Sequence, residues 1–239
     1  MNVTLNSIWG FDDAIATMYL SKRTWTPELD EHIRNTVYER TWRYDGGFTN
    51  IEDDSELKKW MDTLFKIGSR HMTLLRFINF SVSVQDIHRG AQDDFDSHAK
   101  RLDNRIIRSS TRLAKFGENE MSDYYQGQII PTDEALTKLN IALPGRIEVD
   151  GKPYVKAVNG YVREDLANNK DVLRGLYMLS IPSTFIFQCN ITEWAHIYKE
   201  RNTNSGANPE LKAMVETVCE LLQHACPYLT RDLFATIPN

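Results

Sequence analysis

The sequence predicts an α+β fold, in which one domain over residues 1–239 combines a small, mostly antiparallel sheet with several helices. Two patterns indicate this class. Several stretches carry apolar residues at helical spacing, whereas Phe77–Val84 alternates and is rich in β-branched and aromatic residues, as strands are. A third observation is that no repeat, low-complexity tract or clean domain boundary divides the 239 residues. A chain of this length can bury a substantial core.

The first third of the chain is predicted to be helical. Phe11–Lys22 has two acidic residues near its start, where the helix dipole favours negative charge. Pro27–Arg43 has Thr26 as its N-cap and a proline at the first helical position. Asp53–Gly68 carries apolar side chains at helical spacing and ends at a glycine.

The rest of the chain alternates between helices, short strands and an irregular stretch over 117–160. A hairpin is expected within this stretch, because Asp150-Gly151-Lys152 is a favourable turn between two short runs of strand-forming residues. In chain order, the predicted elements are helix Gln92–Lys115, strands Arg146–Val149 and Tyr154–Val158, helix Asp165–Leu179, strand Thr184–Gln188, and helices Thr192–Glu200 and Pro209–Ala225. Pro182 is expected to stop the helix before it, and residues 202–206 are expected to form a polar loop.

The composition is that of a soluble globular protein, with 41% hydrophobic residues, 26% charged residues and a net charge of −5. No apolar run approaches the roughly 20 residues that cross a bilayer, and residues 1–10 lack the pattern of a secretory signal. The cysteines, Cys189, Cys219 and Cys226, have no metal-type spacing and are expected to be reduced thiols. We therefore expect a cytoplasmic protein with no metal ion and no membrane partner.

Two segments far apart in the sequence are interpreted as halves of one anion-binding site. The first, His98–Arg112, carries three hydroxyl residues near its end. Its five cations are Lys100, Arg101, Arg105, Arg108 and Arg112. The second, Asn190–Glu210, adds an amide, an imidazole and Arg201. Guanidinium groups offer planar forks of donors that phosphate oxygens accept in pairs. In an acidic chain, such a basic cluster favours a local anion site over a nucleic-acid surface.

Three landmarks follow one another over roughly residues 69–234. His71-Met72-Thr73 precedes the predicted strand, and Ser110-Thr111-Arg112 closes the basic segment. The third landmark comprises, in chain order, Ile181-Pro182, Phe185-Ile186-Phe187, Asn190, Arg201 and Ala207-Asn208-Pro209-Glu210-Leu211. Their order and spacing resemble the flavin-dependent thymidylate synthases, which have His-x-Thr, the signature Arg-His-Arg-x-x-Ser-x-Asn-x-x-Ser-x-Arg, and Ala-Gln-x-Glu-Ile at the corresponding points.

The match to this signature is complete at its Ser-x-Arg end and partial elsewhere. Lys100 and Arg101 occupy the first two positions of the Arg-His-Arg run, and Ile107 occupies the position of the Asn. The family also places an Arg four residues before the proline, where this chain has Met178. Arg174 lies one helical turn earlier, on nearly the same predicted helix face.

The resemblance implies a flavin-dependent thymidylate synthase-like fold and an FAD-dependent, NADPH-oxidising methyltransferase. Such an enzyme converts dUMP to dTMP with methylenetetrahydrofolate, as a homotetramer whose active sites are shared between subunits. The candidate catalytic residues are Arg201, which would stabilise negative charge on the uracil ring, and Ser110. A nucleophilic role for Ser110 is not favoured, because no base partner is evident in the sequence. The residues implied to bind the nucleotide are Arg108, Ser110, Arg112, Arg174 and Arg201. Those implied to bind flavin are His71, Thr73, Lys100, Arg101, Asn190 and His196.

Three alternative functions stay open. Met178 and Ile107 favour a family homologue that modifies C5 of another pyrimidine nucleotide, for example by hydroxymethylation. The altered Arg-His-Arg positions fit a catalytically inactive nucleotide-binding homologue that has lost flavin. The cationic stretch 100–112 by itself fits a nucleic-acid-binding module, although the net charge of −5 argues against this.

Overall fold

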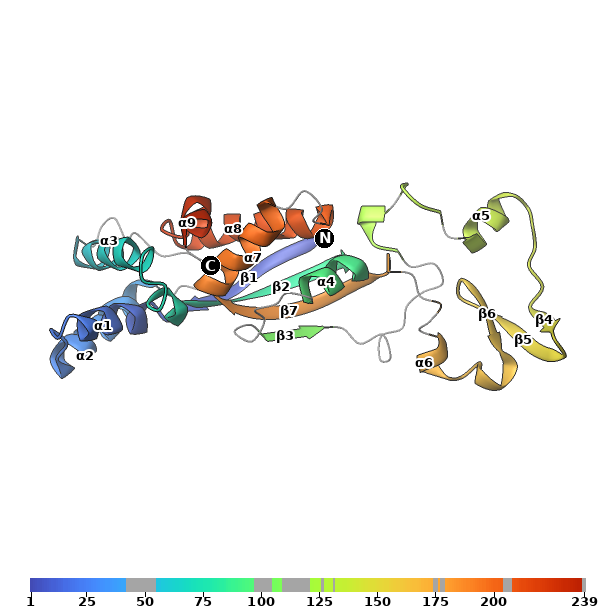
Figure 1. Ribbon diagram of the computed structural model, residues 1–239, viewed down its shortest axis with the longest axis horizontal. Helices are drawn as coiled ribbons and strands as arrows, with labels where there is room; N and C mark the ends of the chain where they lie inside the picture. Colours follow the sequence, from blue (N-terminus) through green and yellow to red (C-terminus); the bar gives the residue numbers. More distant parts are fainter. Residues whose placement is uncertain are drawn as a thin grey trace.

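In the part of the chain that it describes, the computed structural model has two antiparallel sheets (Figure 1). The structure describes residues 1–41, 55–96, 105–108, 121–125, 127–130, 132–173, 176, 179–203 and 208–237. The strand order is β1-β2-β7-β3 in the larger sheet and β4-β5-β6 in the smaller one. Figure 1 shows α7, α8 and α9 above the larger sheet, α1, α2 and α3 at one end of it, and the smaller sheet beyond the opposite end. The predicted α+β class with antiparallel sheets is confirmed.

The larger sheet presents one apolar face and one more polar face. Its strands are β1 (Asn2–Trp9), β2 (Asn79–His88), β3 (Arg105–Arg108) and β7 (Pro182–Asn190). The register places Val82 opposite Phe187 and Val84 opposite Phe185, and all four side chains are buried. Because side chains alternate along a strand, Ser81 and Ser83, which flank Val82, lie on the other face.

Helices pack against the apolar face and around its ends. In chain order they are α1 (Phe11–Ser21), α2 (Pro27–Thr41), α3 (Ser55–Gly68), α4 (Arg89–Asp96), α7 (Ile191–Thr203), α8 (Pro209–Ala225) and α9 (Arg231–Thr236). Trp194 of α7 is fully buried, with its ring edge-on to Phe80 at 5.5 Å and stacked on Phe187 at 6.0 Å between centroids. Aromatic pairs in these geometries stabilise a core beyond the area they bury. They fix α7, which carries two of the predicted site residues, onto the sheet.

The smaller sheet belongs to an arm, residues 127–173, that projects from the rest of the chain (Figure 1). Its elements are α5 (Thr132–Lys138), β4 (Arg146–Val149), β5 (Lys152–Ala157), β6 (Gly160–Arg163) and α6 (Lys170–Leu173). Asp150 and Gly151 adopt positive φ angles of 51° and 71° in the turn between β4 and β5, as tight hairpins require. Among the described residues of the arm, Val162 is the only buried apolar side chain. The arm therefore has almost no core of its own.

Two predicted helices were wrong. The stretch Gln92–Lys115 is not one helix, because α4 ends at Asp96 and Arg105–Arg108 forms strand β3. Hydrogen bonding to the edge of β7 outweighs the local helical periodicity there, and two adjacent isoleucines favour the extended state. Among its described residues, the predicted helix Asp165–Leu179 shrinks to the 3-10 turn Glu164–Leu166 and the four residues of α6.

Besides β3, two strands were not predicted. β1 carries Val3 and Leu5 in alternation, but a bulge between Leu5 and Ser7 interrupts the pattern and hides it. β6 has four residues and pairs only with β5 among the described strands. The remaining predicted elements agree within a few residues, and α7 extends into the first two residues of the expected loop 202–206. Within the described part of the chain, no helix is long and apolar enough to cross a membrane.

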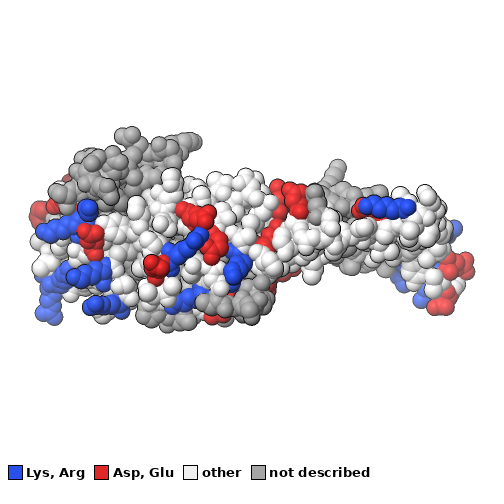
Figure 2. All heavy atoms as spheres, turned by 90° about the horizontal axis from the view of Figure 1, so that it is seen from above, with Lys and Arg blue, Asp and Glu red and all other residues white. Residues whose placement is uncertain are grey.

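The cysteines and the surface charges have ordinary structural roles. No disulfide links the three cysteines, all of which are buried, and burial raises the pKa of Cys219 and Cys226 to about 12. Thiols of this kind are unreactive at neutral pH. On the described part of the face in Figure 2, basic and acidic side chains are interspersed. Arg231, for example, lies 2.8 Å from carboxylate oxygens of both Glu216 and Glu220.

Candidate functional site

One end of the larger sheet gathers several of the predicted flavin residues. β1 ends, β2 begins and β7 ends there, and the register aligns Trp9 with Asn79 and Asn79 with Asn190. Residues directly opposite one another in antiparallel strands project from the same face. Trp9, Asn79 and Asn190 therefore form one row across three strands, called the sheet-end row below.

Asn190 connects the sheet-end row to α7. Its Oδ1 accepts hydrogen bonds from the backbone N–H of Glu193 at 2.9 Å and from the hydroxyl of Thr192 at 2.6 Å. This is the geometry of an N-cap, in which a side-chain oxygen satisfies an N–H group of the first helical turn. The N–H of Ile191 also donates to the carbonyl of Ile78 at 3.0 Å. The start of α7 is thus held against the start of β2.

His71 and Thr73 lie in a turn next to this end of the sheet. The turn follows α3 and leads into the 3-10 turn Leu75–Phe77, which contacts β7 and α7. Both side chains are exposed, and the backbone is held by the Leu74 N–H donating to the His71 carbonyl at 3.2 Å. The structure therefore brings the predicted His71 and Thr73 to the sheet end at which Asn190 lies.

Arg201 lies in the last turn of α7, away from the sheet-end row. Eleven residues separate it from Asn190, which corresponds to about 16 Å along a helix axis. Its side chain is 14% exposed, and one Nη donates to the carbonyl of Asp94 at 2.5 Å while the other lies 3.8 Å from the Asp94 carboxylate. Its Nε is buried and has no hydrogen-bond partner among the described residues. His196 is half-buried between the two ends of α7.

The other predicted site residues are only partly within the described structure. Lys100, Arg101, Ser110, Arg112 and Arg174 lie outside the described residues. Arg108 is described by its backbone alone, which lies in β3 and pairs with Phe185 of β7. Residues 105–108, the described part of the basic segment, thus lie at the edge of the larger sheet, on the far side of β7 from β2.

A buried polar cluster around His88 was not predicted. Glu210, at the start of α8, accepts a hydrogen bond from the His88 N–H at 2.9 Å, and burial raises the pKa of this carboxyl above its usual value. The His88 Nδ1 accepts from the N–H of Ala91 at 3.0 Å, and its Nε2 lies 3.4 Å from the Tyr125 hydroxyl. The cluster fastens α4 and α8 to the end of β2. His88 ends a strand-like run, so the sequence alone offers no periodic signal for it.

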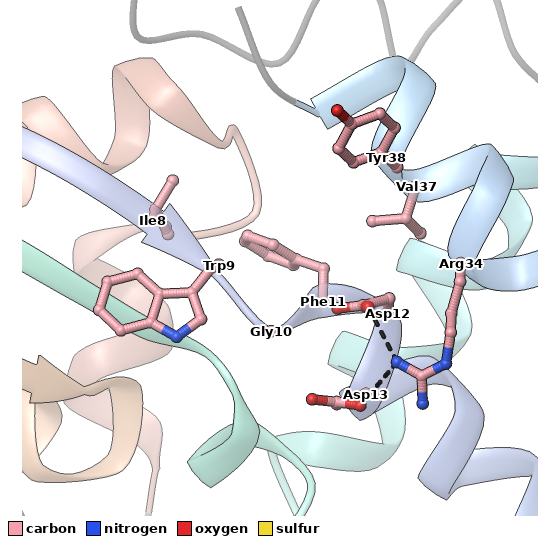
Figure 3. Close-up of a pocket in the computed structure, with 9 residues that line it drawn as sticks. All are labelled: Ile8, Trp9, Gly10, Phe11, Asp12, Asp13, Arg34, Val37 and Tyr38. Carbon is pink, nitrogen blue, oxygen red and sulfur yellow. Dashed lines mark hydrogen bonds and ion pairs between the residues drawn. The ribbon is translucent and has the colours of Figure 1, made fainter.

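A pocket of about 290 Å³ was also not predicted (Figure 3). It is lined by Ile8, Trp9, Gly10, Phe11, Asp12, Asp13, Arg34, Val37 and Tyr38. Gly10 joins β1 to α1 with a φ of 90°, and a Cβ at this position would lie 1.9 Å from the carbonyl oxygen of Phe77. Trp9 belongs to both the pocket and the sheet-end row, so the pocket adjoins the predicted flavin end.

Comparison with known proteins identifies the family. The family described as thymidylate synthase complementing protein, Thy1, matches residues 16–228. The chain belongs to this family, which confirms the resemblance seen in its motifs. No curated protein sequence matches the chain.

Solved structures show the same fold. Two crystal structures of thymidylate synthase ThyX from Helicobacter pylori, both with FAD and dUMP, match with a TM-score of 0.56. The matches cover 98% of this chain and 100% and 99% of those chains, at 14% and 13% sequence identity. The predicted flavin-dependent thymidylate synthase-like fold is thereby confirmed.

Proposed function

We propose that this protein is a flavin-dependent thymidylate synthase that converts dUMP to dTMP with methylenetetrahydrofolate, FAD and NADPH. The observation that carries the proposal is the family match over residues 16–228. The likeness to structures that hold FAD and dUMP supports it. The family landmarks at His71, Thr73, Asn190 and Arg201 also support it, because they recur in this chain in the family's order.

The donor set at the sheet end fits a flavin ring. His71 and Thr73 offer an exposed imidazole and hydroxyl, and Asn190 offers an amide at the same end of the sheet. Such groups can hydrogen-bond the nitrogen and oxygen atoms along the polar edge of a flavin. When bound, FAD would supply the redox and one-carbon transfer chemistry, and these residues would hold and orient its ring. Lys100 and Arg101 are proposed to meet the pyrophosphate, and His196 to contact the ring system from α7.

Arg201 is proposed to act on the nucleotide. Methylation at C5 requires negative charge to develop on the uracil carbonyl oxygens, and a fixed guanidinium close to them lowers the energy of that state. Asp94 holds the guanidinium of Arg201 at the end of α4, which limits its motion. Ser110, Arg112, Arg108 and Arg174 are proposed to hold the rest of the nucleotide, above all its phosphate.

The active site is proposed to be shared between copies in a homotetramer. Within one copy, the flavin end of α7 and Arg201 are about 16 Å apart along the helix. A site that needs both groups is completed more readily when the flavin end of one copy faces the Arg201 end of another. The proposal therefore expects a closed oligomer in which each site has residues from more than one copy.

A turnover assay tests the function. The purified protein is incubated with FAD, NADPH, methylenetetrahydrofolate and dUMP, and the nucleotide is identified by mass. We expect dTMP from the wild type and from the surface variant Arg231→Gln, and no dTMP from Arg201→Gln. If the wild type binds FAD but leaves dUMP unchanged, the synthase proposal fails. The same assay with dCMP then tests modification of another pyrimidine at C5.

A further inference from the structure

The sheet-end row contains two asparagines that stand opposite each other. β2 begins at Asn79 and β7 ends at Asn190, and the register pairs these two residues directly. Side chains of directly opposite residues project from the same face, with Cβ atoms about 5 Å apart. Two such side chains can reach neighbouring atoms on one edge of the same ligand. Asn190 is one of the family landmarks, whereas Asn79 belongs to none of them.

The two amides are oriented in opposite ways by their hydrogen-bond partners. The Nδ2 of Asn79 donates to the Phe77 carbonyl at 2.8 Å. A carbonyl can only accept, so the NH₂ group of Asn79 must face it. The Oδ1 of Asn190 accepts from the Glu193 N–H at 2.9 Å and from the Thr192 hydroxyl at 2.6 Å. A backbone N–H can only donate, so the oxygen of Asn190 must face α7.

The other end of each amide is left for a ligand. Within the described structure, the Asn79 Oδ1 and the Asn190 Nδ2 have no hydrogen-bond partner, and no hydrogen bond joins the two amides. Asn190 is only 6% exposed. A largely buried NH₂ group without a partner costs free energy unless a ligand or a water molecule supplies one. The row thus presents an acceptor on β2 beside a donor on β7.

The side chains around this pair on β1, β2 and β7 are uncharged. The third member of the row is Trp9, and the next row across these three strands contains Ser7, Ser81 and Gln188. A neutral acceptor beside a neutral donor complements a ligand edge that carries an N–H beside a carbonyl, as an imide does. The pair offers no opposite charge to a phosphate or a carboxylate. The chemistry therefore favours the edge of a neutral ring.

We propose that Asn79 and Asn190 together bind the imide edge of a planar ring. Asn79 accepts from the ring N–H, and Asn190 donates to the adjacent carbonyl oxygen. The flavin ring and uracil both carry such an edge. The flavin is the favoured source, because His71 and Thr73 lie at this end of the sheet, whereas Arg201 lies in the last turn of α7. That choice rests on the proposed function, but the imide chemistry follows from the two amides alone.

A ligand with a blocked imide edge tests the proposal on the full chain. In 3-methyl-FAD a methyl group replaces the hydrogen of the ring N–H, and the rest of the molecule is unchanged. We expect the wild type to bind 3-methyl-FAD at least about fivefold more weakly than FAD in fluorescence titrations, because one hydrogen bond is lost and the Asn79 oxygen stays without a partner. Equal affinities for the two flavins, or no binding of either, would overturn the assignment to flavin.

A matched pair of variants shows whether this difference depends on Asn79. Asn79→Ala removes the acceptor and leaves room for the methyl group, so its affinities for the two flavins should agree within about twofold. Gln85→Ala is the control and should keep the wild-type ratio, because Gln85 lies on the same face of β2, about 20 Å from Asn79. If Asn79→Ala binds both flavins more weakly but keeps the ratio, Asn79 serves only the fold and the proposal is overturned.

Two further measurements separate this inference from the proposed function. The same titrations with dUMP and 3-methyl-dUMP test uracil as the source. If Asn79→Ala changes the ratio for this pair and leaves the flavin ratio unchanged, the two amides bind uracil and the flavin assignment is rejected. Formation of dTMP by a wild type that does not distinguish FAD from 3-methyl-FAD would reject the flavin contact and leave the synthase standing. A flavin difference that depends on Asn79, without dTMP formation, would reject the synthase and leave the amide pair standing.

Discussion

The Asn190 amide has an oxygen and an NH₂ group with different roles, and substitutions can distinguish these roles. Oδ1 caps α7, whereas the amide NH₂ is the donor that the proposed flavin contact would use. We expect Asn190→Asp to keep the cap and the melting temperature but to bind FAD more weakly. Asn190→Ala should lose about 1 kcal/mol of unfolding free energy as well. Thermal melts and FAD titration measure the two effects. Wild-type FAD affinity in Asn190→Asp would exclude an amide contact.

Glu210 makes stability depend on pH in a defined direction. Burial raises its pKa in the folded state above the ordinary value of 4.5, so the folded chain holds this proton more tightly than the unfolded chain. The stabilising effect of this proton is complete below the unfolded pKa and is lost as pH rises through the raised folded pKa. We expect the unfolding free energy of the wild type, relative to Glu210→Gln, to fall over this interval. Urea unfolding at a series of pH values measures it, and a rise would contradict the assignment.

At the residue scale, the family motifs indicated candidate ligand-binding residues but not the residues that are brought together by tertiary packing. The family landmarks indicated His71, Thr73, Asn190 and Arg201, and the structure places the first three at one end of the sheet. Whether any of these residues binds a ligand stays a prediction. The His88 cluster and the pocket could not be predicted from the sequence, because each depends on contacts between residues far apart in the chain, such as His88 with Glu210.

The junction between β1 and α1 depends on the absence of a side chain at Gly10. Ala at this position would combine a φ of 90° with a Cβ 1.9 Å from the Phe77 carbonyl oxygen. Gly151→Ala is the matched control. Gly151 also has a positive φ, of 71°, but a Cβ added there would meet no atom within 4 Å apart from its chain neighbours. We expect Gly151→Ala to cost about 1 kcal/mol and Gly10→Ala to cost clearly more. Urea unfolding compares them, and equal losses would show that the backbone at Gly10 relaxes.

Elements with strong local signals were predicted well, and those that depend on pairing were not. α8 was predicted with its observed bounds, because Pro209 and the capping Asn208 mark its start and its apolar stripe is continuous. β3 has four residues and exists through its pairing with β7. Its Ile107 is 80% exposed, so the one side chain of this strand whose burial is described does not face the core.

At the scale of the whole molecule, mixing inactive variants tests the shared site. His71→Ala alters the turn at the flavin end of the sheet, whereas Arg201→Ala alters the last turn of α7. A mixed oligomer therefore contains some sites in which both groups are wild type. We expect activity to return when the two inactive variants are unfolded together and refolded. A mixture of His71→Ala and Thr73→Ala should stay inactive, because every flavin end is defective. No recovery in the first mixture would place the whole site within one copy.

For the overall architecture, the sequence predicted the fold class but not the arrangement of the strands. The α+β class was predicted from periodicity, and the mostly antiparallel sheet was predicted with the family-like fold. Strand order was not predicted, because pairing between β2 and β7 joins segments about a hundred residues apart. The single domain over residues 1–239 and the homotetramer stay predictions. The projecting arm was expected only as an irregular stretch with one hairpin, since it has few apolar positions that would mark its faces.

The arm also implies an uneven distribution of local stability. Amide protons exchange with solvent when their hydrogen bonds open, and segments with few buried contacts open without global unfolding. The arm buries only Val162 among its described apolar residues, whereas β2 and β7 are enclosed by aromatic and aliphatic side chains. We expect amides of β4, β5 and β6 to exchange deuterium orders of magnitude faster than those of β2, as mass spectrometry of peptides can measure. Similar protection in both would mean that the arm is covered in solution, and that a second copy completes its core.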